Sequence, residues 1–192
     1  IDTAQSGTMT TSYQWYADGQ PVGSDTSTLS NSTINEFFAK GHDVYVVLTP
    51  NDGVTDGTPV QSNIVTVLNT APTTPTVSIS ADNDPAEAGV DDLTCTIDTE
   101  ATDGDGDALT YDFTWYDQDG NWAAEELATT ALSHVYPGAD TNVGTWTCEV
   151  VVNDGDADSD IATAVYVVEP SCDGSATYTT QTLASGREVQ GG

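Results

Sequence analysis

Three aspartates at alternate positions form the segment with the clearest capacity for chemistry. The run Asp103-Gly104-Asp105-Gly106-Asp107 presents three carboxylates on a glycine-rich turn. Hard cations such as Ca²⁺ take roughly six to eight oxygen ligands, and flexible loops rich in aspartate supply them. The run is not an EF-hand, because Ala108 and Thr114 stand where that loop requires glycine and glutamate. It predicts either a calcium site at Asp103, Asp105 and Asp107, completed by backbone oxygens, or a solvated acidic loop.

A second acidic cluster alternates further along the chain, at Asp154, Asp156, Asp158 and Asp160. If this segment is extended, its side chains share one face and repel each other, so a bound cation would relieve the repulsion. We take Asp154 and Asp156 as candidate ligands there, and a solvated acidic segment is the alternative.

Catalysis finds little support in the sequence. The histidines, His42 and His134, lie in turn-like surroundings, and no metalloprotease, nucleophile-elbow or phosphate-loop motif accompanies them. Pairs of carboxylates suited to glycoside hydrolysis are abundant, but an acidic composition produces such pairs by itself. We therefore expect no enzymatic activity.

Cys95, Trp115 and Cys148 follow one another with about twenty and about thirty residues between them, which is typical of an immunoglobulin-like β-sandwich. In that fold the tryptophan packs on a disulfide that joins two facing sheets. Apolar and polar residues alternate around all three, as expected of half-buried strands. We expect a disulfide between Cys95 and Cys148. Cys172 then remains for an intermolecular bond or for a partner outside this segment.

The charge balance is extreme, because 31 acidic residues stand against Lys40 and Arg187, for a net charge of −29. Almost nothing can neutralise phosphates, which excludes nucleic-acid binding and disfavours anionic membrane surfaces. Divalent cations or high ionic strength must offset the self-repulsion. A structural disulfide implies an oxidising compartment. We expect an extracellular protein, secreted or at the cell surface, without membrane insertion, and a processed product or segment of a longer polypeptide.

The chain contains an internal repeat of roughly 100 residues, the usual size of one such sandwich. Residues 13–19 match 113–120, and residues 44–53 match 147–155. The predicted domains are an incomplete immunoglobulin-like domain over 1–69, a Pro/Thr linker over 70–75, a complete immunoglobulin-like domain over 76–169, and a tail or donor strand over 170–192.

The first copy begins almost at its tryptophan strand, so the first two strands of the fold are absent. A sandwich without them exposes core residues and open sheet edges that invite pairing, so adjoining chain or another molecule must complete it. The segment 176–183 has high strand propensity and no partner strand. We take Thr177, Tyr178 and Leu183 as candidate donor-strand residues, with Cys172 placed to lock the joint. A frayed terminus or the start of a third repeat is the alternative.

Two further residues are candidates for surface roles. Asn31 lies in an Asn-Ser-Thr sequence, which is an acceptor for N-linked glycans in secreted proteins. Trp122 follows Gly120-Asn121 and is expected in an exposed turn, where it would suit sugar stacking or a subunit contact.

Several short motifs carry a family resemblance: residues 101–111, 114–116 and 151–155 in the second copy, 13–16 and 49–53 in the first, and 69–73 at the boundary. With these motifs the chain resembles the tandem immunoglobulin-like and cadherin-like repeats of large bacterial or archaeal surface proteins. The resemblance covers nearly everything from Tyr13 to Val168, and it implies a stalk, an adhesin shaft or a fibre subunit. It supports calcium in the second copy more than in the first, because the first lacks the acidic run.

The sequence therefore predicts an all-β protein of tandem immunoglobulin-like β-sandwiches, the first lacking its N-terminal strands. We expect a structural subunit or segment of an extracellular fibre, stalk or surface layer, with copies of itself in a head-to-tail polymer or adjoining repeats as partners. The alternative is an adhesive or carbohydrate-binding module of a cell-surface protein. A fibre needs complementary ends, whereas such a module needs loops with exposed aromatic residues.

Overall fold

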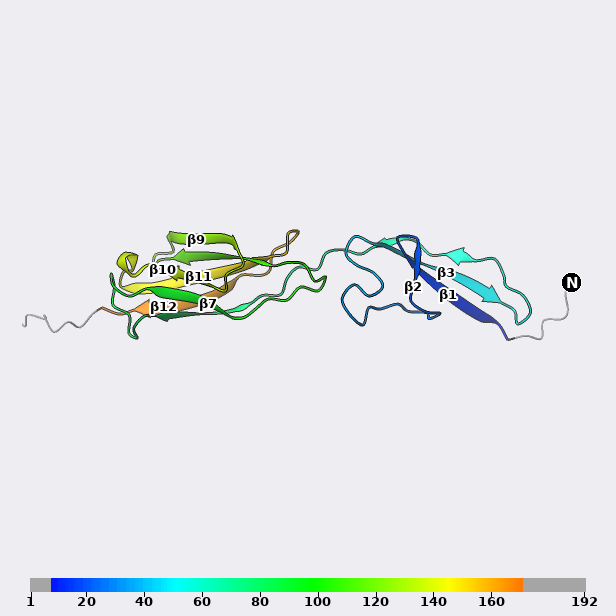
Figure 1. Cartoon of the computed structure of the whole chain (residues 1–192), viewed down its shortest axis with the longest axis horizontal. Coiled ribbons are helices and arrows are strands. Elements are labelled where there is room, and N and C mark those ends of the chain that lie inside the picture. Colours follow the sequence, from blue (N-terminus) through cyan, green and yellow to red (C-terminus); the bar gives the residue numbers. More distant parts are fainter. Residues whose placement is uncertain (1–7, 171–192) are drawn as a thin grey trace, which may run out of the picture.

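The computed structural model describes residues 8–170, which form two β-domains lying end to end (Figure 1). The first domain holds β1 (Thr10–Ala17), β2 (Gln20–Val22), β3 (Asp43–Asn51), β4 (Val60–Gln61) and β5 (Val65–Thr66). The second holds β6 (Thr76–Ala81), β7 (Leu93–Thr99), β8 (Thr110–Tyr116), β9 (Trp122–Thr129), β10 (Ser133–Tyr136), β11 (Gly144–Asn153) and β12 (Ala162–Val168), with a short 3₁₀ turn at Gly138–Asp140. The predicted all-β class is confirmed. Among the described residues, no helix has the length and apolar character needed to span a membrane.

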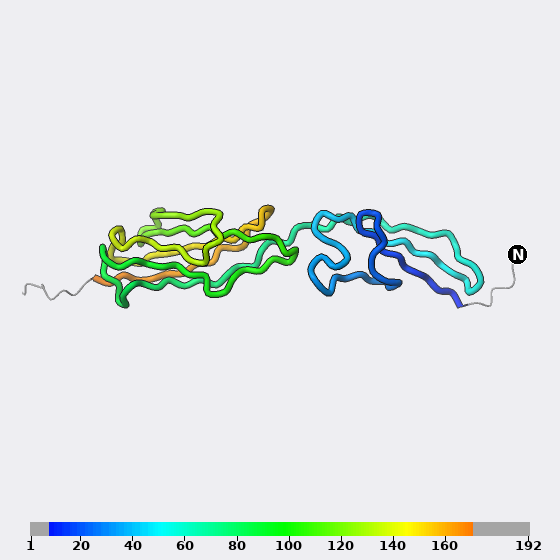
Figure 2. The backbone as a smooth tube through the Cα atoms, viewed as in Figure 1, coloured from blue at the N-terminus to red at the C-terminus, as the bar shows by residue number. Residues whose placement is uncertain are grey.

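The second domain is a complete sandwich of two antiparallel sheets. Their strand orders are β10-β7-β6 and β12-β11-β8-β9, and Figure 2 follows these strands along the long axis of the molecule. Alternate residues of β7, β8 and β11 are buried, as their apolar and polar alternation requires. The side chains of Leu93, Phe113, Trp115, Val150 and Val152 fill the space between the sheets.

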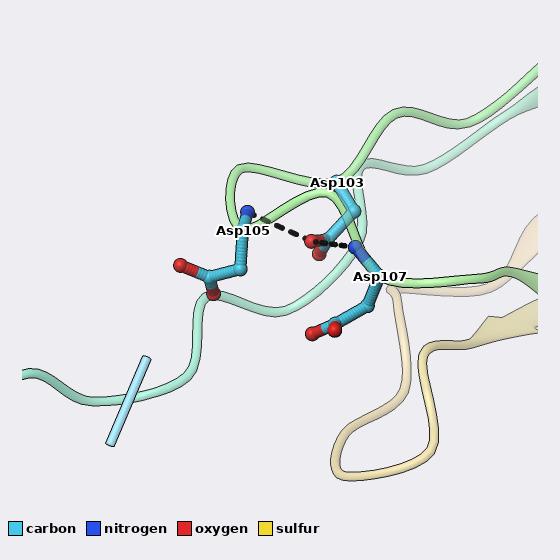
Figure 3. A group of neighbouring side chains, drawn as sticks. All are labelled: Asp103, Asp105 and Asp107. Carbon is cyan, nitrogen blue, oxygen red and sulfur yellow. Dashed lines mark hydrogen bonds between the residues drawn. The ribbon is translucent and has the colours of Figure 1, made fainter. Parts of the chain in front are cut away.

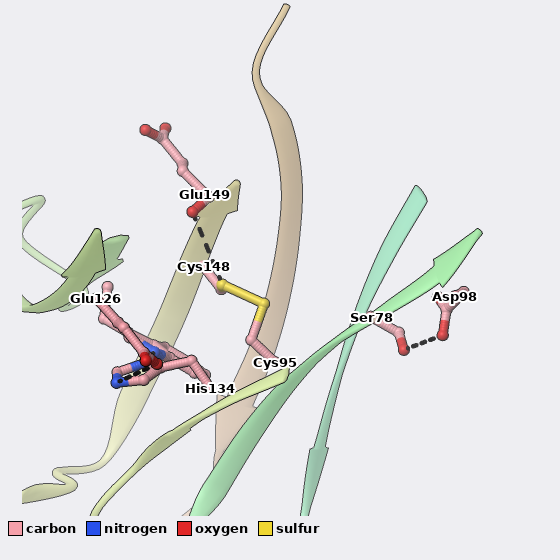
Figure 4. The surroundings of a disulfide bond; sticks show 8 residues. Ser78, Cys95, Asp98, Glu126, His134, Cys148 and Glu149 are labelled. Carbon is pink, nitrogen blue, oxygen red and sulfur yellow. Dashed lines mark hydrogen bonds and ion pairs between the residues drawn. A yellow bond between two sulfur atoms is a disulfide. The ribbon is translucent and has the colours of Figure 1, made fainter. Parts of the chain in front are cut away.

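The predicted disulfide joins Cys95 on β7 to Cys148 on β11, with 2.19 Å between the sulfur atoms (Figure 4). It therefore links the two sheets across the core. Trp115 lies opposite Cys148 in the ladder and is fully buried. Its indole N–H donates to Nδ1 of His134 at 2.9 Å, and His134 Nε2 lies 4.0 Å from Glu126. The histidine thus accepts the hydrogen bond of the Trp115 indole N–H, and a buried indole requires such a partner.

Trp146 occupies the corner position two residues before the second cysteine. Its side chain is buried, and its indole N–H donates to the carbonyl of Asn142, four residues upstream, at 2.9 Å. The bond ties β11 to the turn that precedes it, as a corner tyrosine does in immunoglobulin-like domains.

The two copies pair their strands in the same way. Trp15 lies opposite Val46 between β1 and β3, just as Trp115 lies opposite Cys148 between β8 and β11. Val46 thus holds the position of Cys148. Both copies also close the turn after this strand with an asparagine–aspartate bridge, at Asn51–Asp56 and at Asn153–Asp158.

The first domain contains one sheet where the second contains two. β2, β1, β3 and β4 lie side by side, with β5 also paired to β3. No described strand faces this sheet. Its inward residues, including Trp15, Val44 and Val46, are only half-buried, and Ala17 is the one described hydrophobic residue of this domain that is fully buried. The described part of the first domain is therefore a single sheet without a facing sheet.

The disulfide should dominate the stability of the second domain. It closes a loop with a sequence separation of 53 residues. Replacing both Cys95 and Cys148 by alanine should therefore lower the free energy of unfolding by about 4 kcal/mol in the chain-entropy description. Urea unfolding followed by tryptophan fluorescence measures this change. Cys172→Ser serves as the control, and a double variant as stable as that control would contradict the prediction.

Candidate metal centre at the domain junction

The loop between β7 and β8 crosses from one sheet to the other at the end of the second domain that faces the first domain. Asp103 organises this loop, because its Oδ1 accepts the backbone N–H groups of Asp105 at 2.8 Å and Asp107 at 3.0 Å (Figure 3). One oxygen from each of the three carboxylates lies within 4.8 Å of the other two. The fold thus gathers the three aspartates that the sequence singled out.

Two oxygen atoms of this junction are buried without a hydrogen-bond partner. They are Oδ2 of Asp103 and Oδ1 of Asn69, which belongs to the segment joining the domains. A buried carboxylate oxygen without a partner is costly, and a cation is the usual compensation. The three aspartates are hard oxygen donors and fit Ca²⁺. A calcium ion held there would supply the missing partner of Asp103.

The first domain and the linker pack directly on this loop. The backbone N–H of Thr70 donates to Oδ2 of Asp105 at 2.7 Å, and the Asn35 amide donates to the carbonyl of Asp105 at 3.0 Å. The alternating glycines permit this approach, because a Cβ at Gly104 would lie 3.3 Å from Thr70 and one at Gly106 would lie 3.2 Å from Ile34. The glycines therefore serve the contact between the domains as well as the turn.

The second acidic cluster does not form one extended face. Asp154 Oδ1 accepts the N–H groups of Asp156 and Ala157 and closes a tight turn, and Asp158 accepts the Asn153 amide. Within residues 8–170 only Asp103, Asp105 and Asp107 form a group of three possible metal ligands. The Asn-Asp-Gly turn explains the difference, because its side-chain bonds to the backbone replace an extended strand.

Asp154 and Asp156 instead contact the first domain. Asn69 donates to Oδ2 of Asp154 at 2.9 Å, and this bond, the turn N–H groups and the nearby Lys40 lower the pKa of Asp154 to about 2. Lys40 Nζ lies 2.5 Å from Oδ2 of Asp107 and 2.7 Å from Oδ2 of Asp156. These two carboxylates raise the pKa of Lys40. Lys40 of the first domain thus partly neutralises the negative charge at the acidic end of the second domain.

Sequence reasoning missed Lys40, Asn35, Asn69 and Thr70 as members of the junction. Their contacts join positions 35 to 116 residues apart in the chain. The one available signal was compositional, since Lys40 and Arg187 are the only basic residues against 31 acidic ones.

The other predicted site residues lie away from the junction or outside the described residues. Trp122 is the first residue of β9 rather than part of a turn, and its side chain is 60% exposed. The Asn31 side chain donates to the Phe38 carbonyl and accepts the Phe37 N–H, so it closes its own loop. The candidate assembly residues, Cys172, Thr177, Tyr178 and Leu183, lie outside the described residues.

Comparisons with known proteins add little to this description. No protein-family model and no curated protein sequence matches the chain. Among solved structures it is similar to the chicken CNTN1 FN1–FN3 domains, with 12% identity and a TM-score of 0.40 over 83% of this chain and 57% of that one. The chain thus spans little more than half of that structure. The assignment of the sandwich therefore rests on the strand order given above.

Calcium should stabilise the second domain through Asp103. Titration from excess chelator to millimolar Ca²⁺ should raise the melting temperature, because a ligand that binds only the folded state stabilises it once its concentration exceeds the Kd. Asp103→Asn should abolish the rise. Asp119→Asn removes the same charge from the opposite end of the domain and should leave the rise intact. An unchanged melting temperature in the natural chain would exclude the site.

The bond between Asn69 and Asp154 should appear in the acid stability of the protein. A carboxyl group with a pKa of about 2 when folded and about 3.9 when unfolded contributes stability that is present above pH 4 and lost as the pH falls toward 2. Asn69→Ala should reduce this loss, as measured by urea unfolding across that pH range. Asn63→Ala, at an exposed position, is the control, and equal pH profiles for the two variants would contradict the assignment.

Proposed function

We propose that this chain is a structural segment of an extracellular fibre, stalk or surface layer, assembled head-to-tail through its incomplete first domain. The single observation that carries the proposal is the open apolar face of the first sheet. A groove of about 360 Å³ runs along it, lined chiefly by Trp15, Leu29, Phe38, Val44, Val46 and Val65. In the second domain the corresponding face is covered by the sheet β10-β7-β6. Cys95 of that sheet is bonded to Cys148 across the core.

The repeat indicates which residue types a strand that covers this face should carry. Because Val46 holds the position of Cys148, the strand lying over it should resemble β7, with apolar residues at alternate positions. Full burial of a large apolar side chain is worth roughly 1.5–3 kcal/mol, and because most side chains of this face are already half-buried, covering it would add only part of that gain for each of them. An added strand would also satisfy open backbone groups at the sheet edge, as in donor-strand complementation.

The segment 176–183 is the proposed donor, and chain geometry favours donation to a second copy. β11 runs from Gly144, opposite Val168, to Asn153 at the junction, a length of about 30 Å. Six residues separate Pro170 from Thr177, and the seven Cα–Cα steps between these two residues can span at most about 25 Å. Thr177 therefore cannot reach the groove beyond the junction of its own chain. Donation between copies is a heterologous contact, which generates an open filament.

Three further features support an extracellular structural role. The disulfide suits an oxidising compartment, and the resemblance to repeats of bacterial or archaeal surface proteins points to the same location. The net charge of −29 suits surroundings with high salt or divalent cations. Ca²⁺ at Asp103, Asp105 and Asp107 would brace the junction and stiffen the segment.

A carbohydrate-binding module is the second candidate, and Trp122 is the observation that favours it. This largely exposed indole lies opposite Tyr116 in the ladder, and Tyr116 lines a shallow hollow with Thr147 and Glu149. An aromatic face beside polar groups suits a sugar ring. Glycan binding that disappears in Trp122→Ala would identify this function.

Removal of residues 171–192 tests the proposed assembly. The full chain should form filaments visible by negative-stain electron microscopy, and the shortened chain should sediment as a monomer with a destabilised first domain. Cys172→Ser is the control, because it keeps the donor segment and should leave the filaments intact. Filaments from the shortened chain would refute donation by the tail. A full chain that stays monomeric at high concentration would refute head-to-tail assembly.

A further inference from the structure

The acidic end of the second domain holds two carboxylates that converge on one ammonium group. Asp107 comes from the loop between β7 and β8, and Asp156 comes from the turn after β11. Both Oδ2 atoms lie within hydrogen-bond distance of Lys40 Nζ, at 2.5 and 2.7 Å. Two loops of the second domain thus bind the Lys40 side chain of the first domain.

The first domain presents Lys40 on an ordered turn. The N–H of Gly41 donates to the carbonyl of Val67 at 2.9 Å, and the N–H of Ala39 donates to Nδ1 of His42 at 3.2 Å. The lysine side chain is only 27% exposed. Its backbone is therefore anchored to the residues that lead into the linker, which reduces the entropy lost when the ion pairs form.

We propose that Asp107 and Asp156 form a lysine socket, and that Lys40 docked in it fixes the orientation of the two domains. The surface fits one kind of partner, a preceding domain that presents a lysine on the turn before its central strand. Three further hydrogen bonds surround the socket and align the two domains. Thr70 and Asn35 donate to Asp105, and Asn69 donates to Asp154.

The repeat makes this junction specific. Since Val46 and Cys148 are equivalent, counting six residues back gives Lys40 in the first copy and Asn142 in the second. The second domain thus has no lysine at this position for a following domain. The equivalent of Asp156 is Val54, which is 78% exposed, so the first domain lacks that half of the socket. Lysine and socket match only at this junction, and such pairing discriminates against other end-to-end contacts.

Distance measurements between spin labels test the socket in the full chain. Labels at Gln61→Cys and Thr163→Cys, two exposed strand positions, report the domain orientation in a Cys172→Ser background. Dilution with unlabelled protein keeps the signal within one chain, whether or not it assembles. Chelator removes divalent cations, so the result does not depend on the proposed calcium site or on the filament.

Lys40→Gln should broaden the distance distribution about twofold, and about 1 M salt should broaden that of the natural chain similarly, because screening weakens an exposed ion pair. Arg187→Gln removes the same charge elsewhere and should leave the distribution narrow. The double variant Asp107→Asn with Asp156→Asn should reproduce Lys40→Gln. A distribution that stays narrow in Lys40→Gln, or that broadens equally in Arg187→Gln, would overturn the proposal.

Discussion

The apolar face of a sheet must be covered, and this requirement governs both domains. The second domain meets it with a facing sheet, a disulfide between Cys95 and Cys148, and the buried Trp115. The first domain pairs its strands in the same register but has no described sheet over Trp15 and Val46. The second domain therefore covers its own core, whereas the described part of the first domain leaves the apolar face of its sheet partly exposed. The proposed assembly follows from this difference.

Charge imposes the second constraint, and it acts at the junction. Asp103, Asp105, Asp107, Asp154 and Asp156 gather where the domains meet. Their repulsion is offset by hydrogen bonds from Asn69 and Thr70 and by the ammonium group of Lys40. A protein with 31 acidic residues thus places one of its two basic residues at its most crowded acidic site. This local balance explains how two acidic domains can lie end to end.

The sequence predicted those features of the fold and the site that short segments determine by themselves. Alternation around Cys95, Trp115 and Cys148 identified the sandwich and its disulfide, and the alternating glycines and aspartates identified the loop that gathers three carboxylates. The alternation of aspartates over residues 154–160 suggested one extended face, but the side chains of Asn153 and Asp154 bind backbone N–H groups of a tight turn instead. The partners of Lys40 and Asn69 depend on how the domains dock, which no short segment encodes. The bond from Trp115 to His134 likewise requires the tertiary fold.

The central claim is that the open face of the first sheet is a binding surface for an extended strand. Peptide complementation tests it most directly. A chain lacking residues 171–192 and carrying Trp122→Phe is mixed with a synthetic peptide of residues 175–184, and hydrogen exchange of β1 and β3 is followed together with the tryptophan fluorescence. The account predicts slower exchange in both strands and a blue-shifted emission with the peptide, and neither change with a scrambled peptide of the same composition. Unchanged exchange and emission at saturating peptide would contradict it.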